Sequence, residues 1–514
     1  MGTNNSSRVV VIGAGIGGLT TAALLAQAGY QVTVLEAGTY AGGSAGTFLH
    51  QGYRFDAGAT VAGGFHTNGP HALIGQMLDL EWPVRQHDPA WVVHLPEQQI
   101  ALTQNNEEVL AAFPDAPDFW QQQHRLAELG WKLAAAGMPW PPGDAAEFSQ
   151  LIRVGLSHFP EDLRVIPYAF QTVADWAKRS GLHEHRNFRR FLDAQLLISA
   201  QTTSDRVNAL WGATALDLAR QGVYHVAGGM GGLADVLVDK IHSLGGQVIY
   251  RQRVTGIDVE AGQVTGVRVR KGRRSPVEQR LPADFVIANL TPWSLDQLLG
   301  DDSPTRLQRE VAHLQPGWGA FVLHVGVRAG QLPKLTADHH QMIAHLDGPL
   351  GEGNSVFMSL SPAWDTSRAP DGHRAVTITT HTRTQPWWDA IAQDSSVYEA
   401  RKAEYTALLL DNIERAIPGF ARSIDLLLSG SPVTYQFYTG RYQGMVGGFP
   451  ITSLFRVRGP RTGISNLRLV GDSIFPGQST AGVTLGAIRV AAGVQRHLPL
   501  RTAQTYSFRE ATRS

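Results

Sequence analysis

Residues 8–36 read RVVVIGAGIGGLTTAALLAQAGYQVTVLE, and this stretch decides the fold. Its first five residues are a mostly β-branched run that suits a buried parallel strand, and a glycine-rich turn follows at once. Residues 19–29 have helical spacing and end in a glycine, and residues 31–35 then read as a second strand that leads to Glu36. The order of strand, glycine turn, helix, strand and acid predicts the first unit of a doubly wound α/β fold.

The glycines of this turn predict a dinucleotide site. Gly13 permits the tight turn, Gly15 lets a pyrophosphate approach the backbone, and Gly18 lets the helix pack on the strand. The helix N-terminus turns its positive end toward the phosphates. Glu36 lies 18 residues after Gly18, where an acid can hydrogen-bond to a ribose hydroxyl. The residues of this unit that are predicted to bind the cofactor are Gly13, Ala14, Gly15, Ile16, Gly17, Gly18, Glu36 and Ala37.

Composition narrows the class of protein further. The 514 residues suggest two or three domains. The chain has no cysteine, which excludes disulfides, thiolate metal sites and a flavin tethered through a cysteine. Lys plus Arg and Asp plus Glu both number 44, so the basic excess expected of a nucleic-acid binder is absent. No metal-binding spacing stands out, and His339-His340 reads as a solvated pair in a polar loop. We therefore expect neither a nucleic-acid partner nor a metal.

A second glycine cluster follows directly behind Glu36. Residues 41–46 read AGGSAG and residues 52–60 read GYRFDAGAT. Two such clusters resemble the flavoproteins of the amine oxidase and phytoene desaturase superfamily, in which the second cluster wraps FAD. The commoner form has arginine where this chain has Tyr40 and Ser44, and the chain's own pattern looks like the carotenoid desaturase and isomerase branch. The resemblance implies non-covalent FAD, held in part by Gly43, Ser44, Gly58, Ala59 and Thr60.

The middle of the chain continues the resemblance. Residues 228–233 read GGMGGL and precede an amphipathic helix with a glycine stop. This order is similar to the second half of an FAD domain, in which the backbone at Val254 would clasp the adenine. The strands predicted after the helix cover 247–250, 254–259, 264–270 and 283–289.

The C-terminal part completes it. Residues 466–473 read NLRLVGDS, a strand that ends in Gly-Asp, and the next helix is predicted to begin at Thr484. The resemblance implies that Asp472 hydrogen-bonds to the ribityl and pyrophosphate region. It also implies that the helix points its free N–H groups at the flavin. Further cofactor contacts expected here are Gly471, Gly482 and Val483.

The predicted architecture is an α/β FAD-binding, Rossmann-like domain of the amine oxidase and desaturase type, interleaved with an α+β substrate domain. The substrate domain is helical in pattern in its first insertion and mixes strands with one helix, near 398–416, in its second. The FAD-binding domain is assigned to 1–105, 222–300 and 456–514, and the substrate domain to 106–221 and 301–455.

One motif predicts the substrate. Residues 440–450 read GRYQGMVGGFP and, with Gly58-Ala59-Thr60, look most like the cyanobacterial-type 1-hydroxycarotenoid 3,4-desaturases (C-3',4' desaturases). The resemblance implies that the enzyme introduces a C3–C4 double bond at the end of an acyclic, 1-hydroxylated carotenoid. A polar contact would fix the end of the substrate, and the residues best placed by resemblance are Arg441, Tyr442 and Gln443, whose alternative role is a structural turn.

Other activities fit the same fold. A carotenoid cis–trans isomerase or saturase shares these motifs, and a lipid-escort protein would not need so complete an FAD site. Flavin amine oxidases commonly hold a lysine near flavin N5, and none of the six lysines of this chain lies inside a clear apolar strand. No residue pattern singles out a catalytic acid or base, because the flavin carries the difficult step.

A long lipid substrate suggests a membrane surface. No apolar run reaches the length of a transmembrane helix, so a cytoplasmic protein, peripherally associated with the membrane, is expected. Residues 149–190 hold seven Lys or Arg and four acids beside many apolar side chains, which suits a helical membrane-facing part. Charge at Arg164, Lys178 and Arg179 would support that contact, and the alternative is an ordinary helix with a solvated face.

Overall fold

The computed structural model describes residues 7–157 and 161–500 of the chain. Its first part is a five-stranded parallel sheet with the order β19-β13-β1-β2-β9. The β-branched run near the start of the chain is the central strand, between β2 and β13, and β9 and β19 form the two edges of the sheet. The strands are β1 (Arg8–Ile12), β2 (Gln31–Leu35), β9 (Gln247–Ile249), β13 (Phe285–Ala288) and β19 (Leu467–Leu469).

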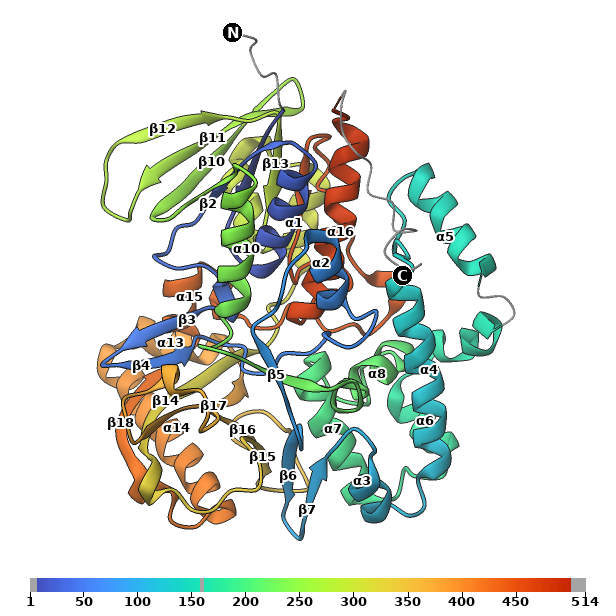
Figure 1. The fold of residues 1–514 in the computed structure, drawn as a ribbon, viewed down its shortest axis with the longest axis vertical. Coiled ribbons are helices and arrows are strands. Elements are labelled where there is room, and N and C mark those ends of the chain that lie inside the picture. The colour runs from blue at the N-terminus through green and yellow to red at the C-terminus, as the bar shows by residue number, and fades with distance from the viewer. Residues whose placement is uncertain (1–6, 158–160, 501–514) are drawn as a thin grey trace.

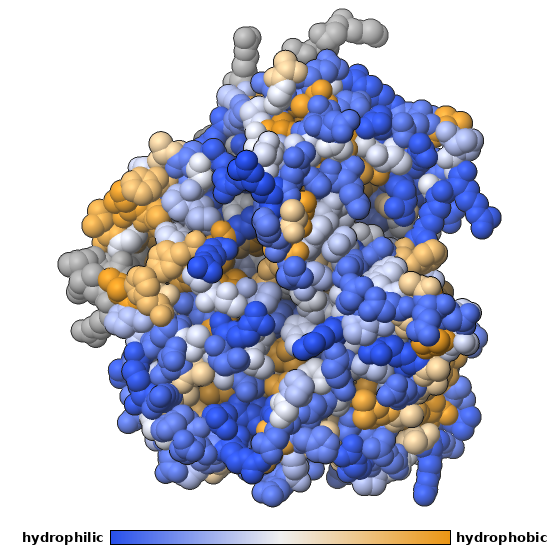
Figure 2. Space-filling view, turned by 180° about the vertical axis from the view of Figure 1, so that it is seen from behind, coloured by the Kyte–Doolittle hydropathy of each residue, from blue (hydrophilic) through white to orange (hydrophobic). Residues whose placement is uncertain are grey.

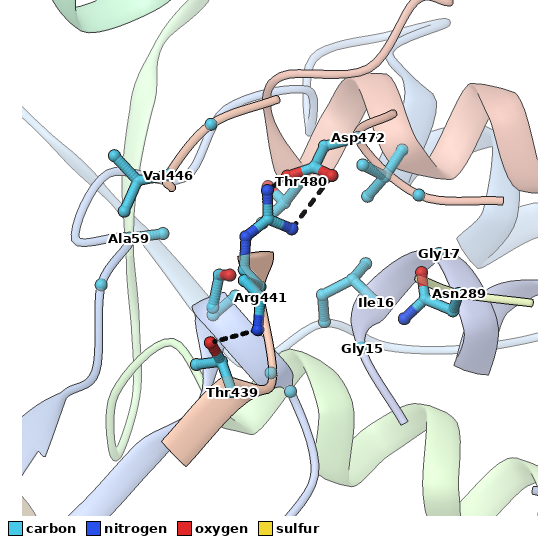
Figure 3. A pocket seen from close by; sticks show the side chains of 18 of the residues that line it. Gly15, Ile16, Gly17, Ala59, Asn289, Thr439, Arg441, Val446, Asp472 and Thr480 are labelled. Atoms are coloured by element: carbon cyan, nitrogen blue, oxygen red, sulfur yellow. Dashed lines mark hydrogen bonds and ion pairs between the residues drawn. The ribbon is translucent and has the colours of Figure 1, made fainter. Parts of the chain in front are cut away.

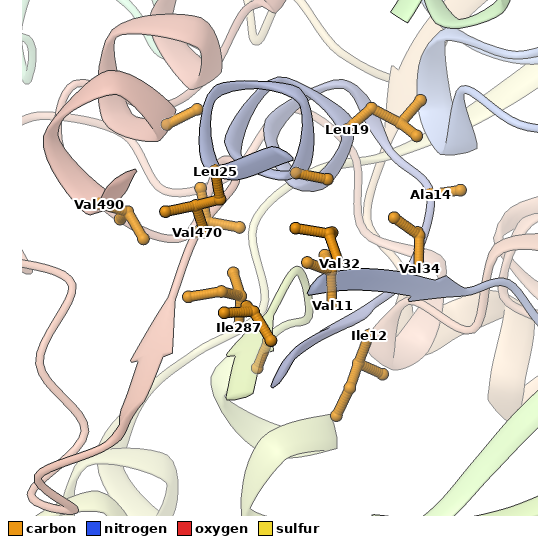
Figure 4. Close-up of a cluster of buried hydrophobic side chains, with 14 of the residues drawn as sticks. Val11, Ile12, Ala14, Leu19, Leu25, Val32, Val34, Ile287, Val470 and Val490 are labelled. Carbon is orange, nitrogen blue, oxygen red and sulfur yellow. The ribbon is translucent and has the colours of Figure 1, made fainter. Parts of the chain in front are cut away.

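Three helices cover one face of this sheet. Helix α1 (Ile16–Gln27) lies between α10 (Gly232–Ser243) and α16 (Thr480–His497) and contacts both (Figure 1). Every residue of α1 up to Ala26 is buried, so the helix is apolar on all sides rather than amphipathic. Figure 4 shows Leu25 of α1 directed toward Val470 and Val490, which come from the far end of the chain. The predicted doubly wound unit is therefore confirmed.

An antiparallel three-stranded sheet follows β9. It consists of β10 (Gln252–Glu260), β11 (Gln263–Lys271) and β12 (Glu278–Pro282). The predicted strands at 254–259 and 264–270 are confirmed as the inner parts of β10 and β11. Two short antiparallel pairs of strands join the parts of the molecule. They are β3 (Thr47–His50) with β4 (Tyr53–Asp56), and β5 (Val84–His87) with β8 (Val223–Val226).

The second part is built on a seven-stranded sheet. Its order is β18-β14-β17-β16-β15-β6-β7, antiparallel except for the parallel pair β15–β6. Strands β6 and β7 fall inside the predicted segment 1–105, so the sheet crosses the boundary drawn at residue 105. The strands are β6 (Trp91–Leu95), β7 (Gln98–Leu102), β14 (Gly319–Arg328), β15 (His339–Ile343), β16 (Ser355–Leu360), β17 (His373–Thr382) and β18 (Ile424–Gly430).

Helices fill the rest of the molecule. The first insertion is helical, as its pattern predicts, with α3 (Glu107–Ala112), α4 (Pro117–Ala135), α5 (Ala145–Ser157), α6 (Val173–Arg179), α7 (Arg186–Ala200), α8 (Ala209–Leu216) and α9 (Leu218–Gln221). The other helices are α2 (Pro70–Leu78), α11 (Pro292–Leu299), α12 (Thr305–His313), α13 (Gln385–Gln393), α14 (Ser395–Ala416) and α15 (Pro432–Thr439). Within 7–157 and 161–500, no helix combines the length and apolar character that crossing a bilayer demands.

One expectation about the histidines is wrong. His339 and His340 are buried in β15 rather than solvated in a loop. His340 Nδ1 lies 3.0 Å from His94 Nε2, and His339 Nε2 lies 3.1 Å from His87 Nε2. Burial lowers the pKa of both His339 and His340, which keeps the rings neutral. His339 and His340 can thus be buried in the sheet because each ring forms a hydrogen bond with a histidine of another strand.

Candidate cofactor and substrate cavity

A cavity of about 920 Å³ lies where the two parts of the molecule meet. One end is formed by the carboxyl ends of β1 and β2 with the glycine turn, and the other by β14, β16, β17 and the helices α7 to α9. In parallel α/β sheets, ligands bind at the carboxyl ends of the strands. We call this space the FAD cavity, after the cofactor that its residues fit.

The glycine turn has the geometry that a pyrophosphate needs. Gly13 adopts a φ of +93°, which a residue with a side chain rarely takes. A Cβ added at Gly15 would lie 2.5 Å from Asn289 Nδ2, and one added at Gly18 would lie 2.4 Å from the Gly13 carbonyl oxygen. Gly13 and Gly15 line the cavity, whereas Gly18 serves close packing of α1. The close packing of α1 at Gly18 is as predicted, and the approach of a pyrophosphate to Gly15 stays a prediction.

Glu36 lines the cavity at the end of β2. Its carboxylate accepts hydrogen bonds from the Ala14 amide at 2.8 Å and from the Gly38 amide at 2.6 Å. The carboxylate therefore holds the glycine turn in place. Its predicted contact with a ribose hydroxyl stays a prediction, and the neighbouring Ala37 also lines the cavity.

The second glycine cluster packs directly on the first. The Gly42 amide donates to the Ala14 carbonyl at 2.8 Å, and a Cβ at Gly43 would lie 3.4 Å from Gly15 Cα. A Cβ at Gly58 would lie 2.7 Å from the hydroxyl of buried Tyr435, so a side chain there would collide. The predicted residues of this region that line the cavity are Gly43, Ser44, Gly58, Ala59 and Thr60.

Asp56 connects two motifs that are distant in the sequence, residues 52–60 and residues 228–233. It is buried, and its carboxylate accepts from the Met230 amide and the Thr47 hydroxyl, both at 2.8 Å. Arg368 forms an ion pair with it at 2.9 Å. A Cβ at Gly229 would lie 2.7 Å from the same carboxylate. The acid of residues 52–60 thus anchors the glycine loop at 228–233.

Asn289 is a central residue that the sequence analysis missed. It follows β13, and its side chain lies close to Gly15, Gly17 and Gly471; Figure 3 shows it beside the first two. A Cβ at Gly471 would lie 2.6 Å from Asn289 Oδ1, and Gly471 itself has a φ of +102°. The signal available in the sequence was a polar residue at the carboxyl end of a buried strand next to β1.

The C-terminal motif brings a charged pair into the cavity wall. Asp472 follows β19 and pairs with Arg441, with Nη1–Oδ1 at 3.0 Å and Nη2–Oδ2 at 2.9 Å (Figure 3). Burial alone would lower the pKa of Arg441, but the carboxylate of Asp472 outweighs burial and leaves that pKa raised. Arg441 also donates from Nε to the Met445 carbonyl oxygen at 2.7 Å.

Helix α16 begins at this wall. It starts at Thr480, four residues before the predicted Thr484, and Ser479 caps it by accepting from the Gly482 amide at 3.0 Å. A Cβ at Gly482 would lie 1.9 Å from the Gly477 carbonyl oxygen, so this glycine serves packing rather than ligand contact. Val483 lines the cavity, and the positive end of the helix faces it.

The mouth of the cofactor end is bridged by an arginine. Val254 lines this end as predicted, together with Arg251 and Arg273, which the sequence analysis did not identify. The Arg273 guanidinium lies 3.6 Å from the ring centroid of Phe437 and donates a hydrogen bond to the Phe437 carbonyl oxygen. This contact joins the loop after β11 to α15 across the opening.

The other end of the cavity is mostly apolar. Its floor is one face of the seven-stranded sheet. Val322 and Ala320 of β14 lie opposite Thr379 and His381 of β17, and all four residues line the cavity. His381 Nε2 lies 3.1 Å from Gln201 Oε1, and burial lowers the pKa of His381 to about 4. This end therefore offers one neutral imidazole–amide pair in largely apolar surroundings. The remaining lining residues at this end include Ile198, Trp211, Ala215, Leu218 and Phe357.

The structure separates the three predicted substrate contacts. Arg441 lines the cavity, but its guanidinium is taken up by Asp472. Tyr442 is stacked on Trp293 with ring centroids 4.4 Å apart, and Gln443 accepts from the Thr384 hydroxyl at 2.9 Å. Neither Tyr442 nor Gln443 lines the FAD cavity. The contacts of Tyr442 and Gln443 fit the alternative role, that of a structural turn, rather than a contact with the substrate.

The cavity fits FAD in shape and in chemistry. Glycines that any side chain would obstruct, an acid at the end of β2 and the N-termini of α1 and α16 suit a dinucleotide. The residues that would hold it are those of the two glycine clusters, Val254, Asn289, Gly471 and Val483. Among the described residues, no group of three or more His, Cys, Asp or Glu is arranged to hold a metal ion.

Comparisons with known proteins agree with this site. The family described as flavin containing amine oxidoreductase matches residues 16–495. The chain is 28% identical to the chloroplastic prolycopene isomerase of Daucus carota, over 98% of this chain and 83% of that protein. It is 23% identical to the neurosporene-forming phytoene desaturase of Cereibacter sphaeroides, over 96% of each chain.

Solved structures share the fold. An oxidoreductase from Methanosarcina mazei has a TM-score of 0.65 at 19% identity, covering 94% of this chain and 99% of its own. Cyclohexylamine oxidase from Brevibacterium oxydans has a TM-score of 0.58 at 15% identity, covering 96% of this chain and 100% of its own. These likenesses confirm the predicted fold class.

Proposed function

The chain belongs to the family of flavin containing amine oxidoreductases and takes FAD as its cofactor, and from that premise we propose that it is a carotenoid desaturase. The reaction proposed is the introduction of a C3–C4 double bond at the end of an acyclic, 1-hydroxylated carotenoid. The observation that carries this proposal is the apolar end of the FAD cavity, with its single imidazole–amide pair of His381 and Gln201.

The lining of the cavity favours a polyene over an amine. Its substrate end presents mostly apolar and aromatic side chains, with fewer hydroxyl, amide and imidazole groups, and this lining suits a long hydrocarbon. No lysine among the described residues lines it, whereas flavin amine oxidases commonly hold one near flavin N5. The names of the relatives, a prolycopene isomerase and a phytoene desaturase, support the same substrate class.

Bound FAD supplies a hydride acceptor, so a C–H bond beside the polyene can lose hydride while a proton leaves the next carbon to a weak base. The chain's own residues orient the substrate and exclude water. The neutral His381 is suited to hydrogen-bond to a terminal hydroxyl, and it would place the end of the polyene, not its middle, at the flavin. Since Arg441 is engaged by Asp472, we assign the polar contact to His381 and Gln201 instead.

A cis–trans isomerase or a saturase is the second candidate. The observation that favours the isomerase is that prolycopene isomerases of several plants match 94–98% of this chain at 27–28% identity. The same cavity would serve all three reactions, because each needs a polyene held against FAD.

One experiment separates these activities. FAD-loaded protein is incubated without oxygen with acyclic carotenoids that do or do not carry a 1-hydroxyl group. A desaturase bleaches the flavin and yields a product two hydrogens lighter that absorbs at longer wavelength. An unchanged mass identifies the isomerase, and a gain of two hydrogens, with added reductant, identifies the saturase. Turnover of amines with release of peroxide, and of no carotenoid, would reject the assignment.

We also propose that the protein works at the cytoplasmic surface of a membrane. Phe148, Ile152 and Leu156 follow one another at helical spacing on α5, with 55%, 48% and 70% of their surface exposed. Nearby in sequence, Phe170 is 73% exposed and stacks on Phe455 with ring centroids 5.2 Å apart. We call these five residues the apolar patch. Figure 2 shows hydrophobic surface gathered on the side of the molecule that carries α5.

Exposed aromatic and aliphatic side chains in such a group are typical of a membrane or partner contact. Of the basic residues predicted to assist, Lys178 and Arg179 are exposed on α6, and Arg179 lies over the ring of Tyr168 at 5.5 Å. The Arg164 side chain lies outside the described residues. The carotenoid is about as long as a bilayer core is thick, about 30 Å, so it must be drawn from the membrane.

A further inference from the structure

A second cavity, of about 1110 Å³, borders the FAD cavity and shares Gln201, Asp472 and Gln478 with it. It is lined by the end of α7 and the loop that follows, by α12, and by residues 449–453 and 456–458. Because exposed arginines surround it, we call it the arginine groove. No predicted site residue other than Asp472 belongs to it.

Five of these arginines have no partner among residues 7–157 and 161–500. They are exposed, and within the described part of the chain none of their guanidinium groups makes a hydrogen bond or an ion pair. They come from four separate segments, so they surround the groove rather than follow one helix. They are Arg206, Arg306, Arg309, Arg383 and Arg456.

The carboxylates that line the groove do not offset this charge. Glu310 is paired with a sixth arginine, Arg458, whose Nε lies 2.6 Å from Oε1. Asp472 is paired with Arg441. In a chain whose formal net charge is zero, this groove therefore gathers five uncompensated positive charges. Such a concentration attracts anions, and guanidinium groups match phosphate oxygens in geometry.

Between its arginines the groove carries both apolar and polar side chains, and it adjoins the apolar patch. Phe455 of the patch stands between Ser453 and Arg456, which both line the groove. A basic border around a partly apolar lining, next to an exposed aromatic pair, suits a surface that lies at a lipid headgroup layer. The apolar lining includes Leu197, Pro316, Trp318, Leu350, Ile451 and Phe475.

We infer that the arginine groove binds the phosphate-bearing headgroups of an anionic membrane. Together with the apolar patch it forms one membrane-facing surface. The inference rests on the proposed membrane location and adds the residues that recognise the lipid. The headgroups would be held beside the wall, formed by Gln201 and Gln478, that separates the groove from the FAD cavity.

The test is vesicle binding by FAD-loaded protein. Wild type, Arg306→Glu/Arg309→Glu and the control Arg125→Glu/Arg422→Glu are floated with phosphatidylglycerol–phosphatidylcholine vesicles and with phosphatidylcholine vesicles. The control pair is exposed, its guanidinium groups make no hydrogen bond or ion pair within the described residues, and it lies outside the groove. FAD content and the unfolding midpoint verify that each variant is folded.

We expect binding of wild type to anionic vesicles to exceed that of the groove variant by about tenfold or more, and to weaken with salt. The control should bind within about twofold of wild type. Equal loss in the control would mean that net charge alone acts, and unchanged binding of the groove variant would overturn the inference. A third arm adds inorganic phosphate at constant ionic strength. If phosphate raises the unfolding midpoint of wild type alone and vesicles bind both proteins equally, the groove is a free-anion site and the lipid assignment falls.

Failure here is separable from failure of the proposed function. Carotenoid conversion is measured for the same variants in detergent micelles, where no anionic bilayer is required. Conversion that persists in the groove variant while vesicle binding is lost supports the inference. Wild type that binds no vesicle of either composition overturns the inference and the membrane location together, and leaves the carotenoid assay to judge the activity.

Discussion

Arg441 and Asp472 form a two-pronged ion pair in the wall of the FAD cavity, although 31 positions separate them in the chain. Both side chains are largely buried, 14% and 17% exposed. Replacing one partner of such a pair leaves an uncompensated charge. The pair fixes the residues before the Gly447-Gly448 bend to the end of β19.

We expect Asp472→Asn to lower the free energy of unfolding by about 3 kcal/mol, because Arg441 loses its counter-charge. The double variant Arg441→Gln/Asp472→Asn should recover part of that loss, since neither residue is then charged. Urea unfolding of the FAD-free proteins measures this. If Asp472→Asn loses FAD but keeps full stability, Asp472 acts on the cofactor alone.

Gly15→Val should abolish FAD binding. A Cβ at this position already lies 2.5 Å from Asn289 Nδ2, and the branched side chain would fill the place of the pyrophosphate. Flavin released from the denatured protein is quantified by chromatography, where wild type should give FAD in a one-to-one ratio. Gly330→Val is the control, because no atom lies within 4 Å of a Cβ there. A Gly15→Val protein that keeps its FAD would contradict the site.

Arg273→Ala should speed the release of FAD about two- to fivefold. The contact between Arg273 and Phe437 spans the cofactor mouth, and an exposed cation–π contact contributes about 0.5–1 kcal/mol. Stopped-flow dilution with flavin fluorescence reports the rate. Arg274→Ala removes the neighbouring exposed charge and should release FAD at the wild-type rate. Equal acceleration in both variants would assign the effect to charge rather than to the bridge.

Acid should destabilise the fold from about pH 6.5 downward. Burial lowers the pKa of His94 and His324 to about 4 and that of His71 to about 3. Below pH 6.5 the unfolded chain binds protons on these rings that the folded chain does not, so stability falls as pH falls. The limiting slope is roughly 1.4 kcal/mol per pH unit for each histidine.

Urea unfolding at a series of pH values from 8 to 5 checks this. His324→Gln removes one buried ring and should flatten the slope in proportion. A free energy of unfolding that stays constant or rises toward pH 5 would contradict the neutral burial of these rings.

Replacing Phe148, Ile152 and Leu156 with serine should weaken vesicle binding at every salt concentration. The three side chains are exposed along one face of α5, so the change should cost affinity without loss of stability. Each large apolar side chain contributes about 1.5–3 kcal/mol when fully buried, so a loss of tenfold or more is expected. Flotation assays measure it. Val277→Ser, at another exposed apolar position, is the control and should bind as wild type does.

The nucleotide-binding part could be predicted because the residues that shape its backbone locally are also those of the cofactor site. Gly13 makes the tight turn and Gly18 lets α1 pack closely, as their spacing predicts, because only glycine fits at either position. Asn289 was missed because its importance depends on β13 lying beside β1, which is a long-range pairing. The boundary predicted at residue 105 leaves β6 and β7 with the FAD-binding segment for the same reason, since β15, the partner of β6, begins more than 200 residues later.

The substrate end was less predictable. Arg441 was identified by its motif, but its partner Asp472 was assigned only to the cofactor, so the ion pair was not foreseen. His381 and Gln201 come from β17 and from the end of α7, and no local pattern relates them. His339 and His340 have polar side chains, and only the strands beside them supply the rings that make burial favourable.

The place of β19 has a consequence for how the protein is made. The seven-stranded sheet has all its strands once residue 430 has left the ribosome, whereas the central parallel sheet waits for residues 467–469. Asp472 and the helix that faces the flavin emerge later still. A growing chain can thus pair the strands of its seven-stranded sheet early but lacks part of the FAD cavity wall until residues 467–483 have been made. We therefore expect a chain that is interrupted before residue 467 to carry no flavin.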